Sequence, residues 1–593
     1  MKQKFVPMLF AAMLALTLAI VGCSTNSSSN SASQGSGSAD AAQASASSSS
    51  SSSADAQSGK TDGFASFDVD AMKKQMEDLY GENKKITNDN YDKSLAVKCV
   101  NGTFVGKKAN GTIAYKGIPF VGEQPTGEHR WKAPVQYTAD DGVYEAYYNG
   151  KSPCQAKSPS ERASLYPMGE DCLYLNIWKA DDTNTEKKPV MVWIHGGAFE
   201  MGGTVDPMYD GEAFVRENPD VVLVSIEYRV GAFGFLHLSH LSDGKDYPDA
   251  QNLGIMDQEM ALKWVHENVE GFGGDPKNVT IFGESAGGGS VTVLPLVKGS
   301  HEYFNRVIAE SGAPVFTRSP EEAIDCTNDL MEELGCKTVA DLQKVDVDKI
   351  IEASRILGLR VWAERDGSYL PTDPYQAYVD GAAKDIDILQ GCNKDEMCYF
   401  VFGFGQDNYK AFREDRYAKK LAQLTDDEKK LMESYEKDVR EKDPDYTGDH
   451  LFDQIVFIAP LIRMSENQTM GGGKSYTYYF TPESTVPLMK CGHAMELPSV
   501  FNHPEEKLGT GRVFDGTFSK TMRKMWVQFA KTGDPSLTAE LSPDGKAKEW
   551  PAYDLDNKWI MVFDEFNIHP AKEADIKILD WDRTYFLTKY YCI

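Results

Sequence analysis

The chain has 593 residues, with 62 Lys and Arg against 89 Asp and Glu and a formal net charge of −27. Nucleic acid carries its own negative phosphates, so this acidic balance argues against it as a partner. Apolar residues make up 41% of the chain and aromatic residues 11%. These fractions are typical of a globular protein with a large core and exclude a largely disordered one.

The first 23 residues have the pattern of an export signal. Lys2 and Lys4 precede an apolar run that is shorter than the about 20 residues of a typical membrane span. The run ends at Ile20-Val21-Gly22-Cys23, which resembles a bacterial lipobox. We therefore expect Cys23 to be lipidated and to anchor an extracytoplasmic protein to a bacterial membrane; a single membrane-spanning helix is the alternative.

Two further segments precede the expected folded body. Residues 24–63 are rich in Ser and Ala and have almost nothing to bury, which predicts a disordered, flexible tether. Residues 64–94 are expected to form a short helical lead-in, because apolar side chains recur at helical spacing over 64–82. The folded domain is expected over 95–593.

The body alternates predicted strands with predicted helices. Helical spacing of apolar residues marks 257–268, and Gly273-Gly274-Asp275-Pro276 after it predicts a helix stop and a turn. Continuous apolar runs, typical of strands buried on both faces, occupy 190–194 and 221–226, and further strands are predicted over 279–282, 306–309, 386–390 and 475–480. This order predicts an α/β fold with a mainly parallel sheet covered by helices on both sides.

Two stretches are expected to form an insertion rather than part of this alternation. Residues 313–378 and 404–462 are charged and look helical. We expect them to cover the carboxyl edge of the sheet, where they would either shape a substrate pocket or have a purely structural role.

The sequence Gly283-Glu284-Ser285-Ala286-Gly287 follows an apolar strand and precedes a small-residue segment. Strand, tight turn and helix form the context of a nucleophile elbow. The turn strains the serine backbone, so Gly283 and Gly287 must lack a Cβ to avoid neighbouring backbone. We therefore predict that Ser285 is a nucleophile.

A serine hydroxyl needs a base, and the base needs a carboxylate to orient it. His493 lies in a glycine-containing loop after the strand 475–480, where the base belongs, and His503 in an Asn-His-Pro turn is the fallback. The strand 386–390 leads to Asp395 and Glu396. Both qualify as the acid by position, and spacing alone does not choose between them.

A glycine-rich loop, His195-Gly196-Gly197-Ala198-Phe199, follows the strand 190–194. Small residues allow backbone N–H groups to approach a substrate oxygen, and this is the position of the second oxyanion loop in such sites. With the amide of Ala286, those of Gly197 and Ala198 would give an oxyanion hole with three donors.

With these motifs in their observed order, the chain resembles the type-B carboxylesterase/cholinesterase family from about Val97 to the C-terminus. The matching segments are Tyr115–Phe120, Glu170–Asn176, His195–Phe199, Asn252–Gln258, Phe272–Pro276, Phe282–Gly287, Asn393–Glu396, Gly492-His493 and Phe529–Pro535.

The resemblance implies the α/β-hydrolase fold and an esterase that forms an acyl-enzyme. It implies Glu396 as the acid, which gives the triad Ser285, Glu396 and His493, and it places oxyanion donors at Gly197, Ala198 and Ala286. Ala198 stands where many relatives have a third glycine.

The family's first disulfide maps to Cys154 and Cys172, and an exported chain would permit it. A second bridge between Cys398 and Cys491 is a hypothesis, because these residues flank the expected acid and base; Cys392 competes with Cys398 for that role.

The resulting interpretation is a membrane-anchored serine carboxylesterase that acts on a small-molecule ester, without a metal or organic cofactor and without an evident protein partner. An amidase or thioesterase with the same triad is one alternative. A binding lipoprotein on an esterase scaffold is the other.

Overall fold

The computed structural model of the chain describes residues 81–158, 162–405, 408–410, 422, 424–444, 448–507 and 509–585. The predicted signal, Cys23, the tether and nearly all of the predicted helix over 64–82 lie outside this part. Where the described chain begins, residues 81–92 form no α-helix, and Lys85 instead forms an isolated bridge with Tyr144.

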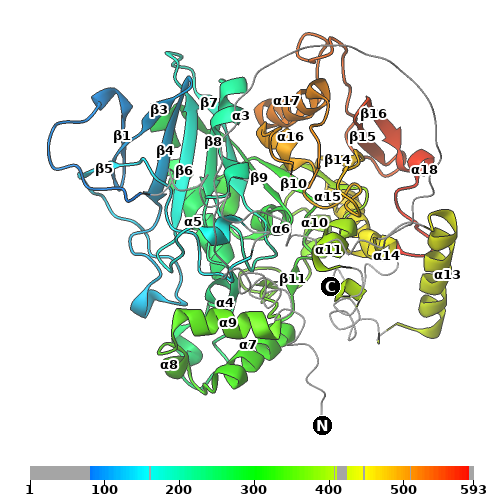
Figure 1. Ribbon diagram of the computed structural model, residues 1–593, viewed down its shortest axis with the longest axis horizontal. Coiled ribbons are helices and arrows are strands. Elements are labelled where there is room, and N and C mark those ends of the chain that lie inside the picture. Colours follow the sequence, from blue (N-terminus) through cyan, green and yellow to red (C-terminus); the bar gives the residue numbers. More distant parts are fainter. Residues whose placement is uncertain are drawn as a thin grey trace, which may run out of the picture.

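An eleven-stranded sheet runs through the molecule in the order β16-β15-β14-β13-β10-β9-β7-β8-β6-β4-β3 (Figure 1). The seven strands from β15 to β8 in this order are parallel, and the outer strands are antiparallel. The predicted mainly parallel sheet is thus confirmed. In chain order the strands are β3 (Lys107–Ala109), β4 (Thr112–Pro119), β6 (Tyr174–Ala180), β7 (Lys188–Ile194), β8 (Val222–Ile226), β9 (Gly274–Glu284), β10 (Arg306–Glu310), β13 (Asp387–Asn393), β14 (Ser475–Phe480), β15 (Trp559–Asp564) and β16 (Asn567–Lys572).

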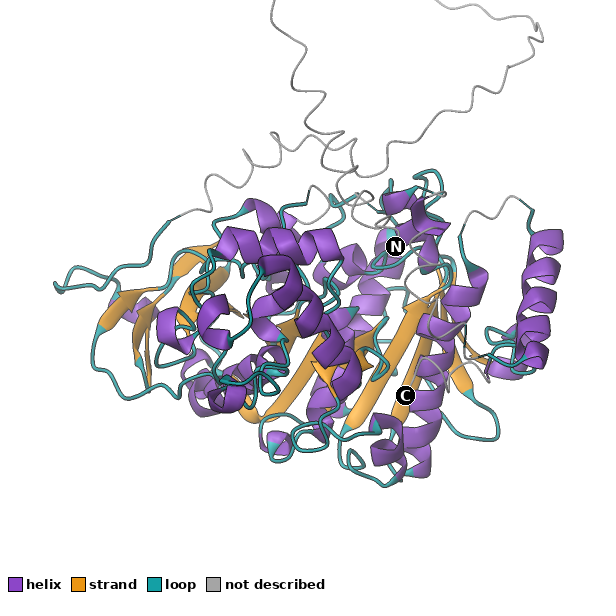
Figure 2. Ribbon diagram, turned by 90° about the horizontal axis from the view of Figure 1, so that it is seen from below, coloured by secondary structure: helices purple, strands orange, loops and turns teal. Residues whose placement is uncertain are grey.

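Strand β7 explains why the central strands are apolar on both faces. Val190, Val192 and Ile194 pack into one core, whereas Met191 and Trp193 pack into another on the opposite side. Helices lie on both sides of the strands in Figure 2. The first core takes residues from α5 (Leu253–Asn268) and α6 (Ala286–Val293), and the second from α3 (Glu212–Glu217), α16 (Leu497–Phe501) and α17 (Gly516–Thr532).

The turn predicted at Gly273–Pro276 is only partly correct. Gly273 adopts a left-handed φ of 86° and ends the preceding helical segment, as expected of a turn glycine. Strand β9 then begins at once at Gly274, which pairs with Lys188 of β7. Pairing with a neighbouring strand, a long-range contact, therefore overrides the local turn signal.

The stretches predicted as an insertion are largely helical, and α7, α8 and α9 lie together along one edge of the molecule in Figure 1. Apart from α4 (Gly231–Gly234), α11 (Met397–Phe404) and α18 (Glu573–Ile576), the α-helices not yet named in the described part of the chain lie wholly or partly within these stretches. They are α7 (Pro320–Leu334), α8 (Val339–Leu342), α9 (Val347–Leu357), α10 (Pro374–Val379), α13 (Asp426–Lys442), α14 (His450–Phe452) and α15 (Ala459–Met470), with a π-helix over Asp453–Ile458.

Two smaller sheets complete the described fold. One contains β1 (Ala96–Cys99), β2 (Gly102–Val105) and β5 (Val143–Glu145), and the other β11 (Thr317–Arg318) and β12 (Ala363–Glu364). Within the described ranges, none of the helices combines the length and the apolar character that crossing a membrane requires.

Candidate active site

Ser285 occupies the tight turn between β9 and α6. Its φ of 58° and ψ of −120° are strained for a residue with a side chain. A Cβ on Gly287 would lie 2.0 Å from the Ile194 carbonyl oxygen, and one on Gly283 would lie 2.6 Å from the same atom. Both distances are too short for real contacts, so the steric reason predicted for the two glycines is confirmed.

His493 and Glu396 meet although 97 residues separate them in the chain. The Nδ1 atom of His493 lies 2.5 Å from Glu396 Oε2, and both side chains are buried. Glu396 directly precedes α11, just past the end of β13, and His493 lies in the loop after β14. Since β13 and β14 are parallel neighbours, their carboxyl ends bring the two loops to the same edge of the sheet.

Two residues that sequence reasoning missed hold Glu396 from the other side. Ser311 Oγ donates to Glu396 Oε1 at 2.5 Å, and the backbone N–H of Asn393 donates to the same oxygen at 2.7 Å. Ser311 directly follows β10, the strand beside β13, and has a left-handed φ of 49°. Its only sequence signal is its position after a strand.

The other ring nitrogen of His493 faces Glu284, the residue before the predicted nucleophile. Nε2 lies 3.0 Å from Glu284 Oε1, although the pair lacks good hydrogen-bond geometry. Among the described residues, the Ser285 hydroxyl forms no hydrogen bond. A Cβ on Gly196 would lie 3.1 Å from Ser285 Cβ and 3.0 Å from Glu284 Oε2, so both side chains line the same loop.

The charge around His493 favours its protonated form. Burial by itself lowers the pKa of the imidazole, but the carboxylates of Glu284 and Glu396 act in the opposite direction. The net result is a pKa well above the usual value. This imidazole is therefore poised to hold a proton taken from a neighbouring group.

The predicted oxyanion loop has a strained backbone whose N–H groups are available. Gly197, Ala198 and Phe199 have positive φ values of 104°, 58° and 61°. A Cβ on Gly197 would lie 2.2 Å from the Met201 carbonyl oxygen, so only glycine fits there. Within the described part of the chain, the amides of Gly197, Ala198 and Ala286 donate no hydrogen bond.

Glu227, which follows β8, braces this loop and was also missed from the sequence. Its Oε1 lies 3.3 Å from His195 Nε2, and its Oε2 accepts hydrogen bonds from the N–H and hydroxyl of Thr204. The His195 ring stacks on Tyr228, whose hydroxyl donates to the His195 carbonyl. These contacts fix both ends of the loop that carries Gly197 and Ala198.

The alternatives that the sequence left open lie elsewhere. Asp395 is tied to the backbone of Cys491: its N–H donates to the Cys491 carbonyl at 3.0 Å, and its Oδ2 accepts from the Cys491 N–H at 3.3 Å. Burial, and then the charge of Asp453, raise the pKa of Asp395 to about 6. His503 lines a separate polar cavity of about 620 Å³ and contacts Glu505 and the Asp210 carbonyl.

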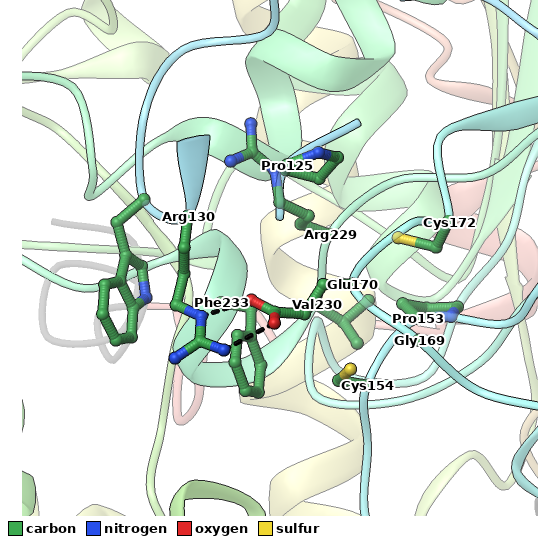
Figure 3. A pocket seen from close by; sticks show the side chains of 11 residues that line it. Pro125, Arg130, Pro153, Cys154, Gly169, Glu170, Cys172, Arg229, Val230 and Phe233 are labelled. Carbon is green, nitrogen blue, oxygen red and sulfur yellow. Dashed lines mark hydrogen bonds and ion pairs between the residues drawn. The ribbon is translucent and has the colours of Figure 1, made fainter. Parts of the chain in front are cut away.

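The disulfide predicted between Cys154 and Cys172 is not present. Both residues are free thiols that line one small cavity, next to the ion pair of Arg130 and Glu170 (Figure 3). Burial raises the pKa of the Cys154 thiol to about 12 and that of Cys172 well above its usual value, which favours the neutral thiol at both positions. The prediction failed because a resemblance supplies matching positions but not the strict geometry that a disulfide requires.

The hypothesis of a bridge between Cys398 and Cys491 is wrong for a similar reason. Cys491 is a free, buried thiol whose Sγ donates to the Phe480 carbonyl at 3.1 Å. The two catalytic loops are instead joined by hydrogen bonds, including one from the His493 N–H to the Glu396 carbonyl at 3.2 Å.

Aromatic side chains surround the imidazole of His493. The ring centroids of Phe457, Phe400 and Tyr399 lie 5.1, 5.4 and 5.9 Å from that of the histidine. Phe457 belongs to the π-helix within the stretch 404–462, and it also packs against Phe316. The predicted insertion therefore contributes directly to the candidate active site.

The chain is similar to known proteins over most of its length. The carboxylesterase family matches over residues 92–575. The chain is 34% identical to a para-nitrobenzyl esterase of Bacillus subtilis (strain 168) over 500 residues, which cover 80% of this chain and 96% of the relative. It is 32% identical to a cholinesterase of Mus musculus over 488 residues, which cover 75% of this chain and 78% of the relative.

Solved structures give the same result. The crystal structure of a Geobacillus stearothermophilus carboxylesterase superimposes with a TM-score of 0.69 at 32% identity, covering 83% of this chain and 99% of the other. These neighbours have the α/β-hydrolase fold. Because the match spans most of the chain in both sequence and structure, this protein belongs to the type-B carboxylesterase family of serine hydrolases, whose reaction is the hydrolysis of carboxylic esters.

Proposed function

We propose that this carboxylesterase hydrolyses its ester through an acyl-enzyme formed on Ser285. His493 takes the proton of the Ser285 hydroxyl as the oxygen attacks the ester carbonyl, and then gives this proton to the departing alcohol. Water, activated by the same imidazole, attacks the acyl-enzyme and releases the acid. Glu396 orients His493 and stabilises the imidazolium.

The contact between His493 and Glu396 is the observation that carries this proposal. The 2.5 Å separation between Nδ1 and Glu396 Oε2 supports Glu396 as the orienting acid, with Nε2 as the nitrogen proposed to transfer the proton. Nε2 faces Glu284, whose neighbour in the chain is Ser285. Catalytic hydrogen bonds are often long in a ligand-free enzyme and tighten when substrate binds, so we expect Nε2 to engage the Ser285 hydroxyl in the substrate complex.

The oxyanion is proposed to bind between the amides of Gly197, Ala198 and Ala286. Their unused N–H groups support this role, and one such donor is typically worth about 2.7–4 kcal/mol of barrier. The position of Ala286 at the first turn of α6 adds the positive end of the helix dipole.

The aromatic environment of His493 supports an ester with an uncharged, apolar or aryl group. Phe400 and Phe457 offer such a group an apolar surface. One relative carries the name para-nitrobenzyl esterase, which makes benzyl and aryl esters of short acids the first compounds to test. Turnover of a panel of esters, each with its matched amide and thioester, would measure the preference for the ester bond. Faster turnover of the amides or thioesters would contradict the proposed esterase activity.

Replacement of the nucleophile tests the mechanism. Ser285→Ala should abolish turnover of a short-chain aryl ester and covalent labelling by an organophosphonate. Ser354→Ala, which removes a hydroxyl that donates to the Ile350 carbonyl within α9, should retain both. Retained turnover in purified Ser285→Ala, or phosphonate found on another residue, would overturn the assignment.

We also propose that the enzyme is lipid-anchored at Cys23, on the outer side of a bacterial membrane. The support is the sequence: two lysines, a short apolar run and Ile20-Val21-Gly22-Cys23. Cys23→Ala should abolish the incorporation of labelled fatty acid that the wild-type protein shows. An unlabelled wild-type protein would contradict the anchor without affecting the proposed chemistry.

A further inference from the structure

Two histidines outside the candidate active site lie side by side at the surface. His237 and His240 belong to the loop after α4, and their ring centroids are 5.5 Å apart. The side chain of His237 is 15% exposed, and His240 is exposed. The proposed esterase mechanism uses neither residue, so any role of the pair is separate from the triad.

Each of the two imidazoles is held by a hydrogen bond at Nδ1. His237 Nδ1 lies 2.7 Å from Oε2 of Glu364, a buried carboxylate on β12, and His240 Nδ1 lies 2.8 Å from the His237 carbonyl oxygen. Carboxylate and carbonyl oxygens only accept, so Nδ1 is the donor in both rings, and each neutral imidazole keeps its lone pair on Nε2. Histidines that bind metals have this arrangement, with the other ring N–H donated to a carboxylate or a backbone carbonyl.

An oxygen atom faces each of the two Nε2 atoms. Ser239 Oγ lies 3.1 Å from His237 Nε2, and Oδ1 of Asn328 on α7 lies 3.0 Å from His240 Nε2. The serine hydroxyl can donate to the first nitrogen, but an amide oxygen has no proton to donate to the second. When His240 is neutral, two lone pairs therefore face each other, and a cation shared between them would make this contact attractive.

The loop, the helix and the buried carboxylate are already joined to one another. The His237 N–H donates to the hydroxyl of Thr327, the residue before Asn328, at 3.1 Å. The backbone of Glu364 forms two hydrogen bonds with the side chain of Asn252, at 2.7 and 3.0 Å. The groups around the two histidines are thus held in place before any ligand arrives, which lowers the entropy cost of binding one.

The separation of the two rings fits one metal ion between them. A metal about 2.0–2.1 Å from Nε2 lies about 3.2 Å from the ring centroid. Centroids 5.5 Å apart then correspond to an angle of about 120° at the metal. This angle is close to the about 109° of the tetrahedral geometry that zinc prefers.

The surroundings favour a cation, and the donor atoms indicate which kind. Helix α7 contains no Lys or Arg, but it contains six acidic residues: Glu321, Glu322, Asp325, Asp329, Glu332 and Glu333. No three His, Cys, Asp or Glu side chains are grouped to bind a metal within the described ranges. This site therefore has two imidazoles and needs amide and water oxygens to complete it. Imidazole nitrogen favours Zn²⁺, Ni²⁺ and Cu²⁺ over Mg²⁺ and Ca²⁺.

We propose that His237 and His240 bind one zinc-like divalent cation through their Nε2 atoms. Asn328 Oδ1 is the third ligand, and water completes the coordination. Glu364 orients His237, and the exposed Ser239 hydroxyl turns to solvent when the ion binds. The bound ion would join the loop to α7 and take no part in ester hydrolysis.

Calorimetric titration of the purified full chain with Zn²⁺ tests the site. The wild-type protein should bind one Zn²⁺ per chain and no Mg²⁺. His240→Gln should raise the Kd for Zn²⁺ at least about tenfold, and it should leave the fold intact because His240 is exposed. His569→Gln is the matched control, since His569 is a partly exposed histidine whose Nδ1 also contacts a backbone carbonyl, that of Asn567 at 2.9 Å. Equal Zn²⁺ affinity in wild type and His240→Gln would overturn the proposal.

Two further variants should change the affinity in opposite directions. Asn328→Asp puts a charged oxygen at the third ligand and should lower the Kd for Zn²⁺ about tenfold or more. Glu364→Gln removes the carboxylate behind His237 and should raise the Kd by about 10- to 100-fold. Circular dichroism confirms that each variant is folded. An unchanged or weaker affinity in folded Asn328→Asp would contradict the ligand set.

Pulsed electron paramagnetic resonance of bound Cu²⁺ counts the imidazoles directly. Two should be detected in the wild-type protein, and one in His240→Gln. A single imidazole in the wild type would mean that the two rings do not share the ion, and the proposal would fail. None of these measurements uses ester turnover, so a failure of the proposed esterase mechanism would leave their results standing.

Discussion

Two kinds of buried carboxylate occur in this molecule, and they differ in what neutralises them. Asp257 on α5 is fully buried and faces Arg229, whose backbone N–H, Nε and Nη2 all donate to it at 2.7–3.0 Å. Arg162 similarly bridges Asp206 and Glu506. The glutamates around His493 have no arginine or lysine as an ion-pair partner in the described part of the chain.

The difference separates carboxylates that support the fold from those that serve the reaction. Asp257 has every ionic and hydrogen-bonding need met, so its charge costs the fold little. Among the described residues, Glu310 Oε2, Glu496 Oε1 and Glu284 Oε1 are buried without a hydrogen-bond partner, which costs stability. Such a cost is typical of active sites, where perturbed groups gather to perform chemistry.

The largest effect is expected at Glu396. Glu396→Gln keeps the shape but removes the charge that orients the imidazole and stabilises the imidazolium, so kcat should fall by about 10⁴. Steady-state kinetics on an aryl ester measures the loss. Asp395→Asn, a matched change at the neighbouring acid, should cost far less, because Asp395 contacts the backbone of Cys491 rather than His493. A larger loss in Asp395→Asn would reverse the assignment of the acid.

Removing the arginine that pairs with Asp257 should lower the stability of the fold rather than kcat. Arg229→Leu leaves Asp257 buried without its partner, so the free energy of unfolding should drop by about 3–5 kcal/mol. Arg216→Leu, at an exposed pair with Glu212, should change it by at most about 1 kcal/mol. Denaturant unfolding measures both values, and titration with an organophosphonate gives kcat per folded molecule. A large kcat loss with unchanged stability in Arg229→Leu would erase the distinction between the two regions.

Sequence reasoning predicted those parts of the fold whose signal is local. Strand β14 matches its predicted range because five aromatic or β-branched residues follow Ser475, and the tight turn at Ser285 was predicted because its strain demands glycines on both sides. The start of β9 was wrong because pairing with β7 decides it. The cysteine pairings were wrong because bridge geometry depends on the packing of distant segments.

The missed site residues share one property. Ser311, Glu310 and Glu227 each lie at or just after a strand end, in no motif, and each acts on a residue that is distant in sequence. Strand order is what brings them to the site: β10 lies between β9 and β13, so whatever ends β10 must lie between the nucleophile and the acid. Knowledge of the strand order would therefore have been enough to predict that these residues lie near the site.

An intermediate effect is expected at Ser311. Ser311→Ala removes a hydrogen bond to the charged Glu396, a kind of bond worth about 1.5–3 kcal/mol. If the loss is felt in the transition state, kcat falls by about 10- to 100-fold. Thr292→Ala is the control, since its hydroxyl donates to a backbone carbonyl within α6. Equal kcat losses in the two variants would show that buried hydroxyls matter here for packing rather than for Glu396.

The smallest effect on kcat at its optimum, and the sharpest test of the glutamates around His493, is expected from Glu284→Gln. The carboxylate raises the pKa of His493, and catalysis needs the neutral imidazole, so the acid limb of kcat/KM should move to lower pH by about one unit or more. Glu505→Gln, which removes a carboxylate 2.9 Å from Nδ1 of His503, should leave this limb in place.

The stability that Glu284 contributes through His493 should also depend on pH. A histidine whose folded pKa is raised contributes stability that is fully present below its unfolded pKa of about 6.5 and is lost as the pH rises through the folded value. Glu284→Gln lowers the folded pKa, so the wild-type advantage in Tm should be largest near about pH 6 and should shrink as the pH rises. An advantage that grows with pH would mean that Glu284 is held against a different cation, and the contrast with Arg229 and Asp257 would then lose its basis.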